Sequence, residues 1–292
     1  MRIDVALEWF LNPDHLPFII GIEQGWFAER GMDVFLNAPE DHYDGLAGVV
    51  SGEMAFACNE PLHMVDEYRP GLKALGTFFE TRGGIMLTPE GLEKLKQGQT
   101  LKMASPVSGE ITDELAAEII ERYIAQQDWP SNPKPVEVHS AGFEHLTNLQ
   151  SGFDAAWLCF YNFEGIEAAH LGLETLFLDT SMVDMANFSA LELFTGAEFF
   201  AEHPALVANF IAVLSQATRF ALQNPQQARE LWYKHTKSEP DALTDAIIND
   251  TCTRFISPVV RDESRWLPMY EQLSDLGLAQ VTRGQFADLY RE

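Results

Sequence analysis

The chain has 292 residues, of which 46% are hydrophobic and 22% charged, a composition typical of soluble globular proteins and not of disordered, collagenous or membrane-spanning chains. Its formal net charge of -25 repels phosphate backbones and anionic lipid headgroups, so we expect no nucleic-acid partner and no membrane insertion. Cys58, Cys159 and Cys252 lie far apart and the histidines form no metal-binding motif, so no metal site and no disulfide framework are expected.

The first part of the chain alternates short apolar runs with amphipathic segments. An apolar run over 3–10 predicts a strand, and residues 17–31 predict a helix that ends at Gly31. Alternation of this kind favours a mainly parallel sheet flanked by helices, with ligands bound at the carboxyl ends of the strands. The strands expected next cover 33–37, 54–59, 72–81 and 83–88, with helices over 43–52 and 60–68.

A second lobe is expected to begin after residue 87, because a new series of strands and helices starts there. The chain then returns to the first lobe through a strand over 188–196 and ends in helices. We therefore predict an α/β protein whose first lobe is 1–87 with 186–292, whose second lobe is 88–185, and whose ligand cleft lies between the two lobes. The second lobe is predicted to hold helices over 110–127, 143–152 and 161–172 and strands over 100–105, 135–140, 154–160 and 175–179, and the tail to hold helices over 203–224, 225–236, 239–255 and 265–277.

Trp9, Asn12 and His15 follow the first predicted strand, where side chains would face the cleft. The functional interpretation is an indole stacked on a flat heterocycle, with Asn12 and His15 hydrogen-bonded to its ring nitrogens or substituents. The alternative is a core tryptophan, an Asx turn at Asn12 and a histidine at the entry of a helix.

Asn59 and His63 follow the third predicted strand and lie one helical turn apart, so they would share a face and line the same cleft. The alternative is that Asn59 caps the helix and Pro61 occupies an early helical position, which requires no ligand.

Two further groups follow strands of the second lobe. The turn at Ser108 and Gly109 enters a long helix and could present backbone N–H groups to an anion, but no lysine or arginine is beside it in sequence, which favours a neutral or amine-bearing ligand. Tyr161, Asn162 and Glu164 form a cluster of aromatic, amide and carboxylate groups suited to an aminopyrimidine edge. The alternative for Glu164 is an ordinary first-turn residue that offsets the helix dipole.

At these residues the chain resembles the thiamin-pyrimidine family, which contains periplasmic pyrimidine-binding proteins of ABC importers and the fungal pyrimidine-precursor synthase. The resemblance lies in LEWFLNPDHLPFIIGIEQGWFAERGMDVFL, GLAGVVSGEMAFACNEPLH, SPVSGEITDEL and WLCFYNFEGIE, and spans roughly the first two thirds of the chain. It implies a two-lobed periplasmic-binding-protein type II fold, each lobe a mixed sheet flanked by helices. The residues that fall where the family contacts its pyrimidine are Trp9, Asn12, His15, His63, Tyr161 and Glu164.

The sequence departs from the synthase branch of that family at two places. The branch has a lysine that holds pyridoxal phosphate as a Schiff base, and this chain has Asn59 at the matching position, which carries no amine. The branch also has a cysteine-rich iron motif where this chain reads VDMANFSALE. We therefore expect no cofactor and no self-consuming synthase reaction.

The leading hypothesis is a substrate-binding protein that captures a thiamin-related aminopyrimidine, of the hydroxymethylpyrimidine or formylaminopyrimidine type, and presents it to an ABC permease. One alternative is a cytoplasmic enzyme of thiamin-pyrimidine biosynthesis on the same fold, with His15 or His63 as general acid or base. Another is a receptor for a different small ligand, such as a sulfonate. The compartment would be periplasmic if a leader was removed, and cytoplasmic if Met1 is the native start.

Overall fold

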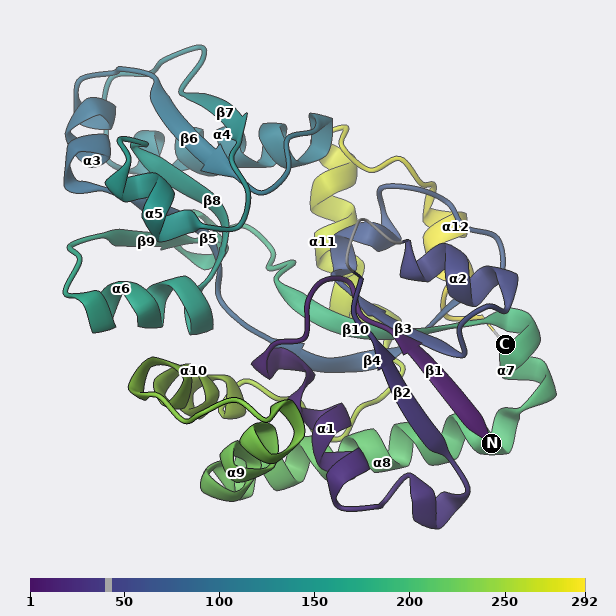
Figure 1. Ribbon diagram of the computed structural model, residues 1–292. Helices are drawn as coiled ribbons and strands as arrows, with labels where there is room; N and C mark the ends of the chain where they lie inside the picture. The colour runs from purple at the N-terminus through teal and green to yellow at the C-terminus, as the bar shows by residue number, and fades with distance from the viewer. Residues whose placement is uncertain (40–43, 292) are drawn as a thin grey trace. The chain divides into compact units, whose positions relative to one another are not determined.

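The computed structural model describes residues 1–39 and 44–291, which form two compact units. The first unit comprises Met1–Glu80 and Phe188–Glu292, and the second comprises Thr81–Asn187 (Figure 1). The chain crosses between the units twice, and the first crossing comes before residue 83. The reason is that the strand over 83–87 pairs with two strands of the second sheet and none of the first.

The first unit is built on a five-stranded mixed sheet. Its strand order is β2-β1-β3-β10-β4, in which β1 runs parallel to β2 and β3, and β10 runs antiparallel to β3 and β4. The antiparallel strand is thus the one contributed by the returning chain. The strands are β1 (Arg2–Ala6), β2 (Asp33–Asn37), β3 (Phe56–Asn59), β4 (Leu72–Glu80) and β10 (Ala190–Gly196).

The second unit repeats this plan with different segments. Its strand order is β7-β6-β8-β5-β9, in which β6 runs parallel to β7 and β8, and β5 runs antiparallel to β8 and β9. In both units the parallel strands end at one edge of the sheet, where their following loops gather. The strands are β5 (Gly83–Leu87), β6 (Leu101–Ser105), β7 (Val136–Ser140), β8 (Ala155–Phe160) and β9 (Leu176–Asp179).

Helices cover both sheets. In the first unit α2 packs on β3 and β10, and α8 packs on α1 and β4. The helices of that unit are α1 (Leu16–Glu23), α2 (Gly45–Ser51), α7 (Ala197–Glu202), α8 (Pro204–Gln223), α9 (Pro225–Thr236), α10 (Ala242–Cys252), α11 (Glu263–Asp275) and α12 (Arg283–Asp288). Those of the second unit are α3 (Pro89–Lys96), α4 (Glu110–Gln126), α5 (His145–Gln150) and α6 (Ile166–Leu171).

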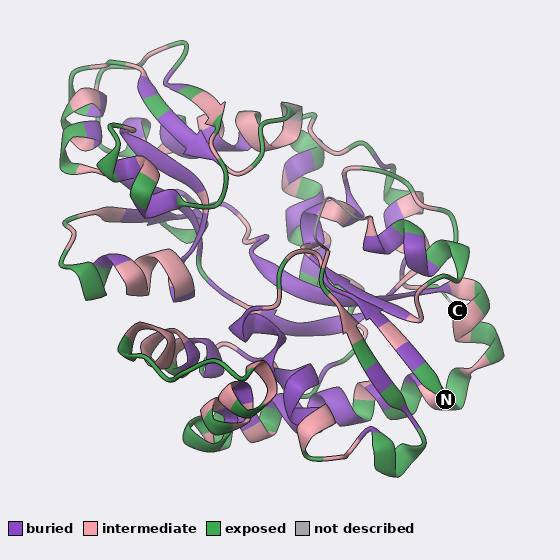
Figure 2. Cartoon of the chain, in the orientation of Figure 1, coloured by how far each residue is buried: buried purple, intermediate pink, exposed green. Residues whose placement is uncertain are grey.

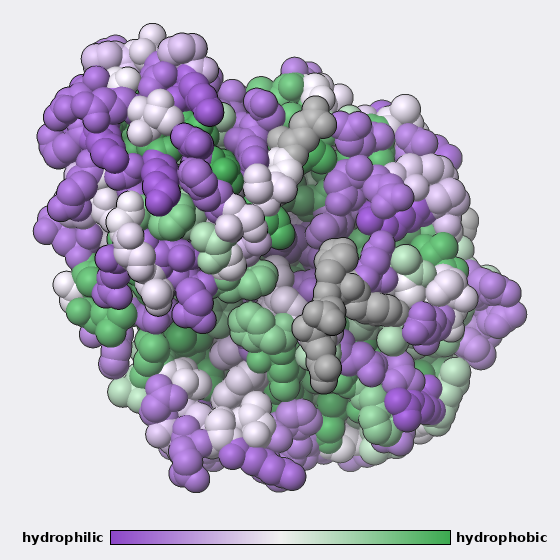
Figure 3. Space-filling view, turned by 45° about the horizontal axis from the view of Figure 1, so that its top comes forward, coloured by the Kyte–Doolittle hydropathy of each residue, from purple (hydrophilic) through white to green (hydrophobic). Residues whose placement is uncertain are grey.

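The core of the first unit centres on Phe210 of α8, whose ring stacks on Phe56 at 3.9 Å and on Phe27 at 4.9 Å between centroids. By length and composition α8 is apolar enough to cross a membrane, but one side of it, which includes Phe210, Val213 and Leu214, is buried in this core. Figure 2 shows β4 and β10 of this unit, and β5 and β8 of the other, as almost continuously buried. On the face in Figure 3, hydrophilic side chains cover much of the surface, as the acidic composition requires.

The structure differs from the predicted elements mainly at their ends. The first strand stops at Ala6 and not at residue 10, because β2 ends at Asn37, the partner of Ala6. The helix predicted over 60–68 is only a 3₁₀ turn, Pro61–Met64. Three short helices, α3, α7 and α12, were not predicted. The predicted helix start at Tyr43 lies outside the described residues.

Candidate functional site

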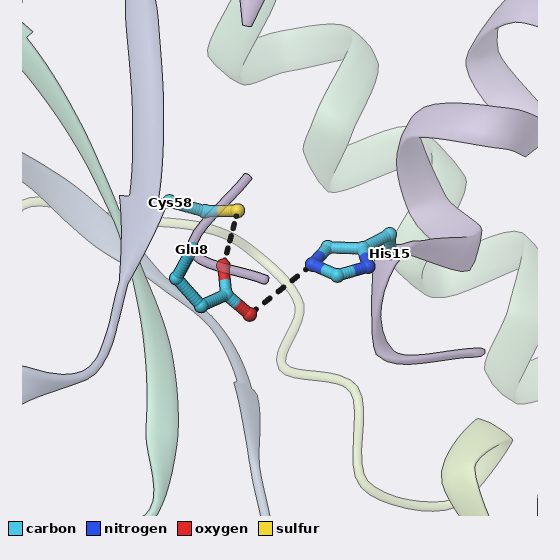
Figure 4. Close-up of side chains that lie close together, drawn as sticks. All are labelled: Glu8, His15 and Cys58. Atoms are coloured by element: carbon cyan, nitrogen blue, oxygen red, sulfur yellow. Dashed lines mark hydrogen bonds and ion pairs between the residues drawn. The ribbon is translucent and has the colours of Figure 1, made fainter. Parts of the chain in front are cut away.

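The polar residues singled out in the first unit follow β1 and β3, which are parallel neighbours in the sheet. Their carboxyl ends therefore meet at one edge, and the loop after β1 lies against the end of β3. Glu8, His15 and Cys58 come together there, with the side chains of all three buried (Figure 4).

His15 is held in one orientation by a capping box at the 3₁₀ turn Pro13–His15. The backbone N–H of Asn12 donates to His15 Nδ1 at 3.2 Å, while Asn12 Oδ1 accepts from the backbone N–H of Asp14 at 2.9 Å. A ring nitrogen that accepts an N–H carries no proton, so the neutral ring has its proton on Nε2. That atom lies 3.2 Å from Glu8 Oε1 and donates to it.

The other oxygen of Glu8 accepts from a thiol. Cys58 Sγ lies 3.1 Å from Glu8 Oε2 (Figure 4). Burial raises the pKa of the Cys58 thiol, and the charge of Glu8 raises it further. The thiol therefore stays protonated, which suits a hydrogen-bond donor and not a nucleophile.

Glu8, His15 and Cys58 also form a candidate metal-ligand set, because one ligand atom of each lies within 4.8 Å of the others. The hydrogen bonds are those of a metal-free network, since a metal ligand needs a free lone pair on Nε2 and a thiolate sulfur. To bind a metal, Nε2 and Sγ would both lose their protons, and His15 Nδ1 would no longer accept from Asn12.

The hydrogen bonds of this network bear on the prediction that Trp9, Asn12 and His15 contact a ligand. Asn12 is 3% exposed and His15 is fully buried, and both have their polar atoms engaged within the chain. Their direct contact with a ligand stays a prediction, and for His15 it would require one of these bonds to break, because each ring nitrogen already has a partner. Trp9 is half-buried, and the next residue, Phe10, is 58% exposed.

Asn59 ends β3 and is buried, with its Oδ1 accepting the backbone N–H of Glu60 at 2.9 Å. This is a local contact and not the predicted helix cap: the N-cap of the 3₁₀ turn is Glu60 and has no side-chain hydrogen bond, while Pro61 does occupy an early position of the turn. A side-chain amide cannot form a Schiff base, so the residue at this position does not fit covalently held pyridoxal phosphate.

His63 belongs to a separate acid–base group. Its Nδ1 lies 2.7 Å from Asp66 Oδ2, and Nε2 makes no hydrogen bond to any other residue that the structure describes. Burial lowers the pKa of His63, but the hydrogen bond to Asp66 together with the negative charges of Asp66 and Glu60 outweighs burial, so the net pKa is raised. Burial also raises the pKa of the neighbouring Glu60 to about 7, although the charge of His63 lowers it. Glu60 and His63 can thus both exchange protons near neutral pH.

In the second unit, the donors of the turn at Ser108 and Gly109 are already hydrogen-bonded to the carboxylate of Asp113. Ser108 Oγ donates to Asp113 Oδ2 at 2.7 Å, and the Gly109 N–H donates to Asp113 Oδ1 at 3.2 Å. The donors that the sequence offered to a ligand are therefore occupied by a carboxylate in the first turns of α4.

Tyr161, Asn162 and Glu164 lie in a single π turn, Tyr161–Gly165, directly after β8. Asn162 is fully buried, and Tyr161 and Glu164 are half-buried. Glu164 Oε2 accepts the backbone N–H of Phe160 at 2.7 Å, and Glu164 has no ion pair with the described residues. Burial raises the pKa of Glu164 to about 8, so the neutral acid predominates at pH 7.

Sequence reasoning missed two residues of these clusters. Glu8 stands beside Trp9, but nothing local shows that its carboxylate joins Cys58 to His15. Arg82 packs its guanidinium over the ring of Tyr161, with Cζ 4.1 Å from the ring centroid. The two residues are far apart in sequence, and only the pairing of β5 with β8 brings them together.

Solved ligand-binding proteins share this fold. The ligand-binding component of an ABC-type import system from Staphylococcus aureus, solved with zinc bound, matches with a TM-score of 0.73 at 12% identity over 100% of this chain and 96% of that protein. The periplasmic aliphatic sulphonate binding protein SsuA from Escherichia coli matches with a TM-score of 0.69 at 11% identity over 100% of this chain and 92% of that protein. The chain therefore has the α/β fold of periplasmic binding proteins, with two mixed sheets flanked by helices, which confirms the predicted fold class.

The family follows from the sequence comparison. The model of the NMT1/THI5 like family matches residues 12–228, and the chain belongs to this family. The 4-amino-5-hydroxymethyl-2-methylpyrimidine phosphate synthase of Legionella pneumophila is 22% identical over 274 residues, which cover 91% of this chain and 83% of that protein. The resemblance stated from the sequence is thereby confirmed.

Proposed function

We propose that this chain is a substrate-binding protein that captures a thiamin-related aminopyrimidine, of the hydroxymethylpyrimidine or formylaminopyrimidine type, for import or salvage. The observation that carries the proposal is Glu164, a half-buried carboxyl with no ion-pair partner among the described residues and a pKa raised to about 8 by burial. A carboxyl that stays neutral at pH 7 offers an O–H donor and a carbonyl acceptor side by side.

An aminopyrimidine presents the complementary pattern, because its exocyclic amine donates and the adjacent ring nitrogen accepts. The Glu164 carboxyl interacts only with backbone N–H groups, that of Phe160 among them, and it keeps hydrogen-bonding capacity for the ligand. The half-buried ring of Tyr161 precedes this carboxyl by three residues and supplies an aromatic surface of the kind that flat heterocycles pack against. Trp9 keeps its predicted role as an indole that stacks on the ligand.

Other observations support binding over covalent chemistry. Asn59 offers no amine, and burial keeps the Cys58 thiol protonated. The segment VDMANFSALE contains no cysteine that could hold iron. The importer role and a partner permease belong to this proposal.

Isothermal titration calorimetry with hydroxymethylpyrimidine and formylaminopyrimidine tests the proposal. We expect Glu164→Leu to weaken binding about tenfold or more, because the apolar side chain can neither donate nor accept a hydrogen bond, whereas Glu164→Gln, whose amide has an acceptor beside a donor as the neutral acid does, should keep most of the affinity. Glu174→Leu, at an exposed glutamate of the same unit, is the control and should bind like the wild type. Wild-type protein that binds neither pyrimidine contradicts the proposed ligand class.

A second candidate function is an enzyme of thiamin-pyrimidine metabolism, and His63 favours it. The Asp66 carboxylate at 2.7 Å orients the ring so that Nε2 is free to accept a proton, beside Glu60 whose pKa is about 7. If the chain is an enzyme, incubation with its substrate followed by mass spectrometry should show turnover that His63→Ala abolishes while ligand binding persists. Binding without turnover in the wild type would contradict the enzyme and leave the receptor as the remaining function.

A further inference from the structure

Arg82 occupies a fixed position at the carboxyl end of β8. Gly83, the first residue of β5, pairs with Phe160, the last residue of β8, and the Arg82 carbonyl accepts the backbone N–H of Tyr161 at 2.9 Å. The backbone therefore anchors Arg82 directly beside the π turn that carries Tyr161 and Glu164.

The guanidinium of Arg82 is held by three neighbours of the same unit. Its Nε donates to Asp179 Oδ2 at 2.8 Å. Its Cζ lies 4.1 Å from the ring centroid of Tyr161 and 5.7 Å from that of Phe177. Asp179 is itself fixed, because its Oδ1 accepts from the backbone N–H and the hydroxyl of Ser181. Much of the conformational entropy of a long side chain is therefore lost before any ligand arrives.

This arrangement leaves most of the donors of Arg82 unused. A guanidinium has five N–H donors, and Asp179 takes only the one on Nε. The two terminal amino groups, Nη1 and Nη2, make no hydrogen bond within residues 1–39 and 44–291, and the side chain is 48% exposed. Two parallel N–H groups at fixed spacing match the oxygens of a phosphate, sulfonate or carboxylate.

We propose that Arg82 forms an anion subsite beside Tyr161, so that the ligand of this site carries an anionic group in addition to its flat ring. The inference rests on the proposed function and narrows it from a neutral aminopyrimidine to an anionic derivative, such as the phosphate ester of the alcohol. It reverses the expectation of a neutral or amine-bearing ligand, which considered only charges near Ser108 in sequence.

The net charge of -25 does not prevent such binding. At physiological salt, charges farther apart than about 8 Å are largely screened. The terminal N–H groups of Arg82, and not the total charge of the protein, therefore decide the affinity for an anion. Asp179 lowers the net charge beside the subsite, but it engages Nε and not the terminal amino groups.

The test compares hydroxymethylpyrimidine with its phosphate ester by calorimetry, with inorganic phosphate as a third ligand followed by ³¹P line broadening. In the wild type we expect the ester to bind about ten- to hundredfold more tightly than the alcohol. Arg82→Gln should remove the preference for the ester and leave the affinity for the alcohol within about twofold of the wild-type value. Arg82→Lys keeps the charge but loses the two parallel N–H groups, so it should retain only part of the preference for the ester. Arg122→Gln is the matched control, since it removes one charge from an arginine that pairs with Glu118 on α4.

Each outcome separates the inference from the proposed function. If the ester and the alcohol bind equally, or if Arg82→Gln weakens both alike, the anion subsite is wrong and the pyrimidine receptor stands. If neither pyrimidine binds but phosphate broadening depends on Arg82, the subsite stands and the receptor proposal fails. If neither pyrimidine binds and phosphate is insensitive to Arg82, both are wrong.

Discussion

The strand ends of the two units carry similar polar side chains and use them differently. In the first unit Glu8, Asn12, His15 and Cys58 hydrogen-bond to one another or to nearby backbone, in a buried network with both oxygens of Glu8 occupied. In the second unit Arg82 donates one hydrogen bond, from Nε to Asp179, and Glu164 has no ion pair with the described residues, so both keep further donors or acceptors. A polar group at a strand end is therefore available to a ligand only where its neighbours leave part of its hydrogen-bonding capacity unused.

Breaking the network of the first unit should have the largest effect on stability. His15→Ala leaves the buried Glu8 carboxylate without one donor and the Asn12 N–H without its acceptor. Loss of these bonds together with the cavity should lower the free energy of unfolding by about 3–5 kcal/mol, measured by urea denaturation. The exposed His170→Ala on α6 is the control. A loss below about 1 kcal/mol would mean that the network contributes little.

The buried carboxyl of Glu192 in β10 should make the first unit sensitive to pH. Burial raises the pKa of Glu192 to about 7, although hydrogen bonds from Thr77 at 2.6 Å and Trp266 at 3.2 Å oppose this. Because the folded state binds this proton more tightly than the unfolded state, its stabilising contribution is complete below about pH 4.5 and is lost as pH rises through about 7.

Glu192→Gln keeps an oxygen that accepts both hydrogen bonds and removes the titration. We expect the variant to gain about 3 kcal/mol relative to the wild type between pH 4.5 and 8, from urea unfolding at several pH values. The exposed Glu198→Gln should leave the pH dependence of the wild type unchanged. Parallel stability curves for Glu192→Gln and the wild type would contradict the assignment.

The turn at Ser108 and Gly109, at the start of α4, should make a smaller contribution to the free energy of unfolding. Asp113→Ala removes the carboxylate that accepts from Ser108 and Gly109 at the start of α4. The cost should be about 1 kcal/mol in thermal or urea unfolding, typical of a lost helix cap. Glu114→Ala, an exposed neighbour, is the control. An increase in stability would show that the carboxylate crowds the turn instead of capping it.

The smallest expected effect is that of zinc. Because the hydrogen bond from Asn12 keeps the proton of His15 on Nε2 and burial keeps Cys58 protonated, one equivalent of Zn²⁺ should raise the melting temperature by less than about 1 °C. Differential scanning fluorimetry with and without a chelator measures this. A larger rise that disappears in Cys58→Ala would identify Glu8, His15 and Cys58 as metal ligands.

The alternation of apolar runs and amphipathic segments was sufficient to predict most strands and helices and the α/β class, because these depend on local periodicity. Element ends were less accurate. The strand ending at Ala6 and the short 3₁₀ turn Pro61–Met64 depend on where partner strands stop and on local capping, which periodicity does not encode.

What the sequence by itself determined was the family, the order of the elements and the candidates Trp9, Tyr161 and Glu164 at strand ends. Only the tertiary structure decided which polar groups are already satisfied, as in the bonds of His15 to Asn12 and Glu8, and which distant residues meet, as Arg82 meets Tyr161. The physical reason is that hydrogen-bond saturation and burial are properties of neighbours in space, and strand pairing brings such neighbours together from distant parts of the chain.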